Sequence, residues 1–130
     1  MNAKLIKAVT LKLGGKESAS EVWEDIVNHG ADSGFCGFTY YTDTVAFFKR
    51  NRKEIMELAK EMAQEFGYNV IELVASFGCL KQYDKNELHD DIANTLYNPS
   101  KPNTIVANAM AWFALEEVAR YKVDQKELQD

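Results

Sequence analysis

Residues 105–121 read IVANAMAWFALEEVARY and form the most apolar stretch of the chain. At the 3.6-residue period of an α-helix, its large side chains cover nearly the whole circumference, which is typical of a helix surrounded by other elements. The pattern therefore predicts a central helix. Pro99 and Pro102 break the chain before it, so we expect the helix to begin at Asn103 or Thr104.

Two carboxylates lie within this apolar helix. Glu116 falls on the arc of Trp112, and Glu117 falls on the arc of Phe113. Carboxylates on an apolar arc are costly unless they are paired, and Arg120 follows Glu116 at the four-residue spacing that favours an intrahelical ion pair. We expect Glu116, Glu117 and Arg120 to form a polar latch that fixes the core. The alternative is a pair of buried general acids with raised pKa values.

Outward from this helix, apolar residues recur every three or four positions along almost the whole chain. Residues 38–42 (FTYYT) are the one β-like stretch, and they are too short to build a sheet alone. The sequence predicts an all-α single domain over residues 1–130, with about six helices and a short extended segment near 38–42. The helix boundaries are predicted at Gly14, at a capping box of Ser18 and Glu21, at Gly30, Asp43 or Thr44, Gly67, Asn69, Gly78 and Asp84.

Length and composition bound the class of protein. A chain of 130 residues is long enough for one hydrophobic core. With 46% hydrophobic and 27% charged residues it does not have the composition of a disordered protein. No run approaches 18 consecutive apolar residues, and the first residues alternate lysine with apolar side chains, so we expect neither a membrane span nor a secretion signal. The sequence predicts a soluble cytoplasmic protein.

The charge balance disfavours nucleic acid as a direct partner. Fifteen basic against twenty acidic residues give a net charge of −5, whereas binding to DNA or RNA relies on clustered lysine and arginine. The longest basic cluster is residues 49–53 (KRNRK), and it runs directly into Glu54. We interpret that cluster as a solvated surface.

The candidate metal ligands are few and widely spaced. His29, His89, Cys36 and Cys79 lack the closely spaced pairs that a structural zinc site needs. The two cysteines are expected to behave as small hydrophobic residues or as a loop thiol. The sequence predicts no metal and no cofactor.

One doublet keeps an enzymatic alternative open. His89-Asp90 resembles the central doublet of the HD-type metal-dependent phosphohydrolases, which are also all-helical, and His29 and Asp124 are candidates for the remaining ligands. The other interpretation is an exposed helical run over residues 87–91 (ELHDD), which we favour because a two-residue motif arises often by chance.

An acidic stripe is predicted on the helix that precedes Gly67. That helix carries an apolar stripe ending at Phe66, and beside it four glutamates fall within an arc of about 80°. Like charges four residues apart are mildly unfavourable for a helix, yet a protein that competes with DNA for a basic groove would present them. The alternative is an ordinary solvated face. The four residues are Glu54, Glu57, Glu61 and Glu65.

Aromatic residues cluster around the glycine-rich residues 30–37 (GADSGFCG). Exposed aromatics on an adaptable loop are good anchors for a protein partner. The alternative is that they fold back onto the core. The four aromatics in question are Phe35, Phe38, Tyr40 and Tyr41.

Two segments resemble a pattern found in small acidic proteins encoded by phages and other mobile elements. The resemblance covers most of residues 20–121, but residues 80–103 do not align with it. It implies a host cytoplasm and an accessory role. The residues that carry it are His29-Gly30, Ser33-Gly34, residues 40–44 (YYTDT), Phe47-Phe48 and residues 111–119 (AWFALEEVA).

Small acidic proteins in that setting often bind and block a host protein. We therefore expect a non-enzymatic inhibitor of a host nucleic-acid-processing or defence complex, of the anti-restriction or anti-CRISPR kind, whose partner has a basic groove. One alternative is the metal-dependent phosphohydrolase. Another is a homo-oligomer that sequesters a nucleotide signal, with the glycine–aromatic loop stacking on the base.

Overall fold

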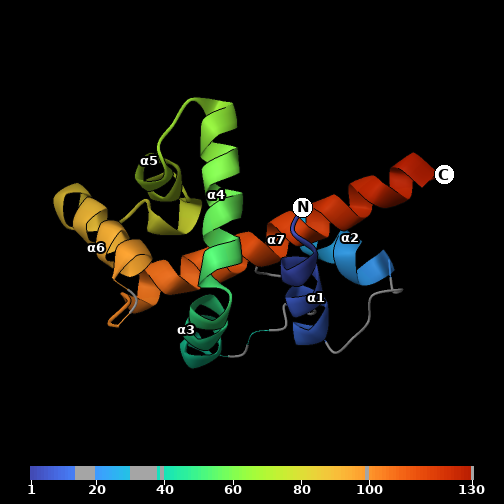
Figure 1. Cartoon of the computed structure of the whole chain (residues 1–130), viewed down its shortest axis with the longest axis horizontal. Coiled ribbons are helices and arrows are strands. Elements are labelled where there is room, and N and C mark those ends of the chain that lie inside the picture. The colour runs from blue at the N-terminus through green and yellow to red at the C-terminus, as the bar shows by residue number, and fades with distance from the viewer. Residues whose placement is uncertain (14–19, 30–37, 39, 99, 130) are drawn as a thin grey trace. The chain divides into compact units, whose positions relative to one another are not determined.

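The computed structural model describes residues 1–13, 20–29, 38, 40–98 and 100–129. Within these ranges the regular structure is helical and no strand is assigned, which confirms the predicted all-α class. The helices, shown in Figure 1, are α1 (Ala3–Lys12), α2 (Ser20–His29), α3 (Tyr41–Arg50), α4 (Arg52–Phe66), α5 (Val70–Ala75), the short 3₁₀ helix η2 (Gly78–Leu80), α6 (Lys85–Tyr97) and α7 (Thr104–Gln129).

The chain packs into two compact units. The first comprises Met1–Thr39 and Trp112–Asp130, and the second comprises Tyr40–Ala111. Helices α1 and α2 therefore belong to the first unit and α3 to α6 to the second, while α7 contributes its beginning to the second unit and the rest to the first. That residues 1–130 form a single domain stays a prediction.

The core of the first unit combines aliphatic and aromatic side chains. Phe38 packs edge-to-face against Trp112, with ring centroids 5.2 Å apart, and the Lys12 ammonium lies 5.1 Å from the centre of the Phe38 ring. Both contacts are of stabilising kinds. The other buried residues of this core include Leu5, Val9, Val22, Trp23, Ile26, Phe113, Leu115 and Val118.

In the second unit α5 packs against both α4 and α6 and lies between them (Figure 1). Helix α3 meets α4 at Asn51, whose side-chain amide donates to the Phe47 carbonyl at 3.0 Å and so ends α3. The core residues of this unit include Phe47, Phe48, Ile55, Ala59, Val74, Leu80, Ile92, Leu96, Val106 and Met110.

Several predicted helix boundaries are confirmed. Gly67 ends α4 with φ of 73°, a left-handed conformation that favours glycine. The Asp84 carboxylate accepts the Asn86 amide at 2.9 Å at the start of α6. Asn103 caps α7, because its side-chain oxygen accepts the amides of Ile105 and Val106 at 3.0 and 3.1 Å. The predicted boundaries at Gly14, Ser18 and Gly30 lie outside the described residues.

The predicted extended segment near 38–42 is wrong at its end. Tyr41 and Thr42 already belong to α3, which begins before the expected cap at Asp43 or Thr44. Tyr40 has extended backbone, and its carbonyl accepts the Asp43 and Thr44 amides. The Thr44 hydroxyl then donates to the Tyr41 carbonyl at 2.8 Å. These helical hydrogen bonds override the β-propensity of the aromatic and β-branched residues.

Candidate protein-binding surface

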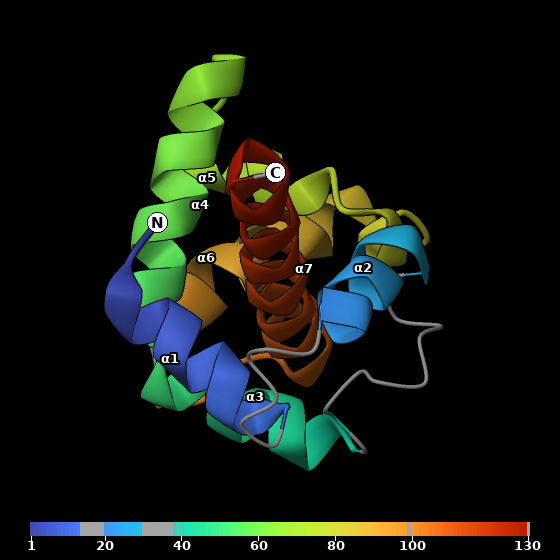
Figure 2. The same ribbon diagram turned by 90° about the vertical axis from the view of Figure 1, so that its right-hand side faces the viewer.

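Helix α4 has one buried face and one face open to solvent. Ile55, Met56, Ala59 and Ala63 are buried, and an exposed face carries three carboxylates. Figures 1 and 2 both show α3 at the end where α4 begins, so the opposite end of α4 points away from α3. The exposed carboxylates, which we call the α4 acidic face, are Glu57, Glu61 and Glu65.

Glu54 does not belong to this face. Its side chain is only 6% exposed, so the predicted row of four accessible glutamates contains three. Glu54 lies in the first turn of α4, where the positive end of the helix dipole favours a carboxylate. A single-helix pattern could not reveal this burial, since it depends on what packs around the beginning of α4.

The α4 acidic face presents its charges as a regular row. Consecutive carboxylates are four residues apart, which corresponds to about 6 Å along the helix axis. In the part of the chain that the structure describes, no ion pair involves any of the three. Lys53 and Lys60 are also exposed on α4 and border the row. The three negative charges are therefore available to a partner.

The four predicted aromatic anchors have different fates. Phe38 is buried against Trp112, so its ring folds back onto the core, which is one of the two alternatives that the sequence leaves open. Phe35 lies outside the described residues. Tyr40 and Tyr41 are exposed where α3 begins.

Tyr40 and Tyr41 do not share a surface with the end of the acidic face. Helix α3 separates them from Asn51, and most of α4 then separates Asn51 from Glu65, which alone corresponds to about 20 Å of helix. The two views agree that α3 and the far end of α4 lie at opposite ends of this pair of helices (Figures 1 and 2). The predicted combination of these anchors with the whole stripe is therefore not one compact site.

Two aromatics that sequence reasoning missed are exposed at the C-terminal end of α4 instead. Phe66, predicted to belong to the apolar stripe, is 62% exposed, and Tyr68 is 51% exposed. Ala63 is the last buried residue of α4, so Phe66 extends beyond the region that the rest of the second unit covers. The available signal was its position directly before the helix-ending Gly67.

The basic cluster at 49–53 is partly structural. Arg52 donates from its guanidinium to the Leu96 carbonyl at the end of α6, and its Nε is buried with no hydrogen-bond partner in the structure described. Asn51 is buried as well. Lys49, Arg50 and Lys53 are exposed, as expected of a solvated surface.

Among the described residues the candidate metal ligands are not grouped into a site, and Cys36 lies outside those residues. His29 ends α2, exposed, with its Nε2 3.8 Å from an Asp25 carboxylate oxygen. His89 and Asp90 are exposed on α6. Among all the residues that the structure describes, no group of three or more histidines, cysteines or acidic residues is arranged to hold a metal ion.

The ion pair expected on α7 forms between a different pair of residues, while the role of Glu116, Glu117 and Arg120 in fixing the core stays a prediction. Arg120 forms its ion pair with Glu117, three residues before it, and not with Glu116. Glu116 is partly buried, and this burial raises the pKa of its carboxyl; Arg120 opposes the shift and Glu117 adds to it. Residues three and four positions apart on a helix are both neighbours, so Glu117 is within reach of Arg120 as well as Glu116.

A polar cluster in the second unit was missed entirely. The Tyr83 hydroxyl donates to Asp91, and the Asn103 side-chain amide donates to the Tyr83 oxygen at 2.9 Å. The Asn103 backbone amide donates to the Thr95 hydroxyl at 2.9 Å. The hydrogen bond to Asp91, together with burial, raises the pKa of Tyr83. The cluster ties α6 to the segments that precede α6 and α7.

None of the described helices combines the length and apolar character that crossing a membrane requires.

Comparison with known proteins gives one finding. No curated protein and no solved structure matches the chain. A family described as a domain of unknown function, DUF7222, matches residues 2–128. Because that match covers nearly the whole sequence, the chain belongs to the DUF7222 family.

Proposed function

We propose that this chain is a non-enzymatic binding protein that occupies a basic surface of a protein partner. The observation that supports this function is the α4 acidic face, where Glu57, Glu61 and Glu65 are exposed and make no ion pair among the described residues. Exposed carboxylates without partners steer association toward positive surfaces and add specificity for them.

The spacing of the row strengthens this argument. Neighbouring carboxylates lie about 6 Å apart along the axis, which is shorter than the Debye length of about 8 Å at physiological salt. Their fields therefore add at a surface that approaches the helix. The net charge of −5 acts in the same direction, because it repels nucleic acid and attracts basic proteins.

The partner we propose is a host protein whose basic groove normally holds nucleic acid. A nuclease or another defence complex has such a groove, and the resemblance to proteins of phages and other mobile elements supports that setting. Occupation of the groove by α4 would exclude nucleic acid by direct competition, so the chain would inhibit without catalysis.

Affinity capture from host lysate, read by native mass spectrometry, tests this function. The bait is the full chain, the variant E57Q/E61Q/E65Q, or the control E87Q/D90N/D124N, which removes three exposed acidic charges elsewhere. We expect the wild type and the control to retain the same protein, the E57Q/E61Q/E65Q variant to lose it, and high salt to release it. Equal retention by both triple variants would contradict the proposal.

A further inference from the structure

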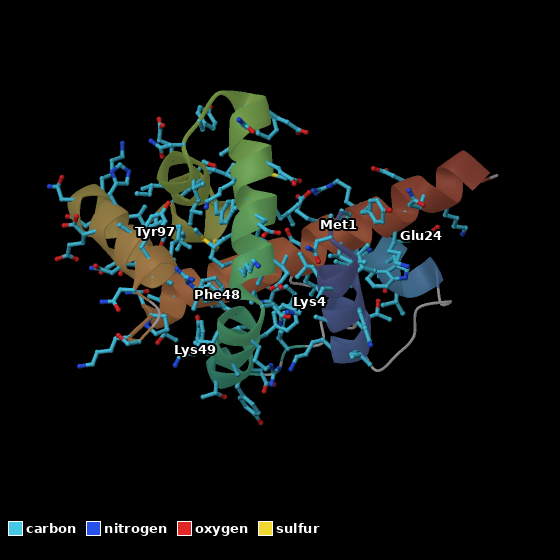
Figure 3. All side chains as sticks on the ribbon, viewed as in Figure 1. Met1, Lys4, Glu24, Phe48, Lys49 and Tyr97 are labelled. Atoms are coloured by element: carbon cyan, nitrogen blue, oxygen red, sulfur yellow. The ribbon has the colours of Figure 1, made fainter. Side chains whose placement is uncertain are left out.

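Helix α1 has an exposed face that combines lysines with a leucine. Leu11 is 64% exposed, and Lys4, which Figure 3 labels, and Lys7 are exposed as well. At about 100° per residue these three side chains fall within an arc of about 60°, opposite the buried Leu5 and Val9. Lys7 makes no ion pair among the described residues. We call Lys4, Lys7 and Leu11 the α1 basic face.

The charge of this part of the sequence is opposite to that of the rest. Residues 1–16 contain four lysines and no acidic residue, so all twenty acidic residues lie in 17–130 with the other eleven basic ones. Two exposed lysines are too few to hold nucleic acid against the negative charge of the remaining chain. They are instead complementary to an acidic protein surface, and the chain itself carries one.

Two half-buried apolar side chains border the α4 acidic face. Leu58 and Met62 are partly exposed, and Glu61 and Glu65 lie next to them on the helix. These four residues occupy positions i, i+3, i+4 and i+7, where side chains are neighbours. Such a group forms the hole that receives one side chain of a facing helix in knobs-into-holes packing. Its two apolar and two acidic corners match an apolar side chain with lysines beside it.

We propose that the α1 basic face of one copy docks on the α4 acidic face of a second copy, with Leu11 in this hole. In the parallel alignment, Lys7 lies about 6 Å before Leu11 along the axis, and Glu57 lies about as far before the centre of the hole. Both lysines then run alongside the carboxylates. In the antiparallel alignment, Lys4 would extend past Gly67, where α4 has ended.

This inference goes beyond the proposed function, because it concerns two copies of one chain and requires no host protein. The contact joins one ten-residue helix to part of another, so it belongs with the small interfaces of transient complexes. We therefore expect a weak self-association that covers the α4 acidic face at high concentration and that a more basic partner displaces.

Sedimentation velocity of the full chain, at up to about 1 mM protein, tests the self-association. We expect the weight-average sedimentation coefficient to rise with concentration at about 20 mM salt and to stay that of a monomer at about 300 mM, where exposed charges are screened. L11A should weaken the association about ten-fold, since burial of most of a leucine side chain contributes a factor of that order. Because Leu11 is 64% exposed, the circular dichroism spectrum of L11A should be unchanged.

A charge exchange identifies the two faces. K4E/K7E makes both faces acidic, and E57K/E61K makes both basic, so each variant alone should stay monomeric at concentrations where the wild type associates. In an equimolar mixture the acidic α1 of the first variant faces the basic α4 of the second. Association should then return.

The matched control is K81E/K85E, which has the net charge of K4E/K7E but alters exposed lysines just before and at the start of α6. It should associate as the wild type does. A wild type that is monomeric throughout would overturn the inference, and so would a mixture that fails to associate. Equal loss in K81E/K85E and K4E/K7E would assign the effect to net charge and would overturn it as well. None of these results alters the capture of a host protein, so the proposed function is tested separately.

Discussion

Replacing Gly67 with alanine isolates the backbone conformation that ends α4 and places Tyr68. A Cβ added at Gly67 would meet no atom within 4 Å, so the substitution introduces no clash. The substitution is costly because Gly67 has a left-handed backbone, with φ of 73°. Holding a residue with a Cβ in that conformation costs about 1–2 kcal/mol. Alanine also restricts the unfolded chain, which returns about 0.4–1 kcal/mol. We expect G67A to lower the free energy of unfolding by about 1 kcal/mol.

Gly78 supplies the matched control. A Cβ there would also meet no atom within 4 Å, but Gly78 does not have a positive φ. The unfolded-state gain of about 0.4–1 kcal/mol then remains without a strain cost. We expect G78A to be neutral or stabilising, so the two variants should differ by about 1–2 kcal/mol, the strain of the left-handed residue alone.

Urea unfolding followed by circular dichroism measures both variants under the same conditions. The midpoint should fall for G67A and stay or rise for G78A, with the slope unchanged in both. Equal shifts would refute the assignment of the cost to the backbone at Gly67, because the unfolded-state effect is common to the two substitutions.

Three further predictions concern polar groups. N103A removes the cap of α7 and the hydrogen bond to Tyr83, and it should lower the free energy of unfolding by about 1–2 kcal/mol in urea titrations. Surface substitutions usually change this free energy by less than about 0.5 kcal/mol, so a change that small would contradict the role of Asn103 as a cap. R52M removes the donor to the Leu96 carbonyl together with the buried Nε; we expect thermal unfolding at a lower temperature, by an amount that corresponds to about 1 kcal/mol, whereas an unchanged midpoint would show that the bond does not contribute. E116Q should stabilise the protein at pH 7, since burial raises the pKa of Glu116 and so disfavours its charged form in the folded state. That advantage should vanish as the pH falls below 4.5, the ordinary value, where the carboxyl is protonated in both states; an advantage independent of pH would contradict the assignment.

Much of the fold could be predicted because its signals are local. The apolar period identifies the helices, and the boundaries at Gly67, Asp84 and Asn103 follow from the conformation or hydrogen bonds of single residues. The side chains of Tyr41 and Thr42 favour strands and so predict the wrong structure, whereas hydrogen bonds to the Tyr40 carbonyl start a helix there.

The candidate surface could be predicted only in part. The helical period places Glu57, Glu61 and Glu65 on one face, but it places Glu54 there too, and only the packed structure buries that residue. The exposure of Phe66 also depends on where the rest of the second unit stops covering α4. A pattern on one helix contains no information about its neighbours.

The polar cluster around Tyr83 shows the same limit at longer range. Tyr83 and Asn103 are twenty residues apart, and nothing in their local sequence indicates that they meet. Hydrogen bonds of this kind follow from the arrangement of helices, which sequence periodicity does not determine.

The measurement that tests the central claim most directly is a titration of the ¹⁵N-labelled chain with nona-arginine, followed by the chemical shifts of its backbone amides. The account predicts that the shifts change first and most strongly in residues 57–65, along the α4 acidic face, and that added salt reverses them. Changes spread evenly over all acidic residues, or centred on the exposed carboxylates of α6, would contradict the account.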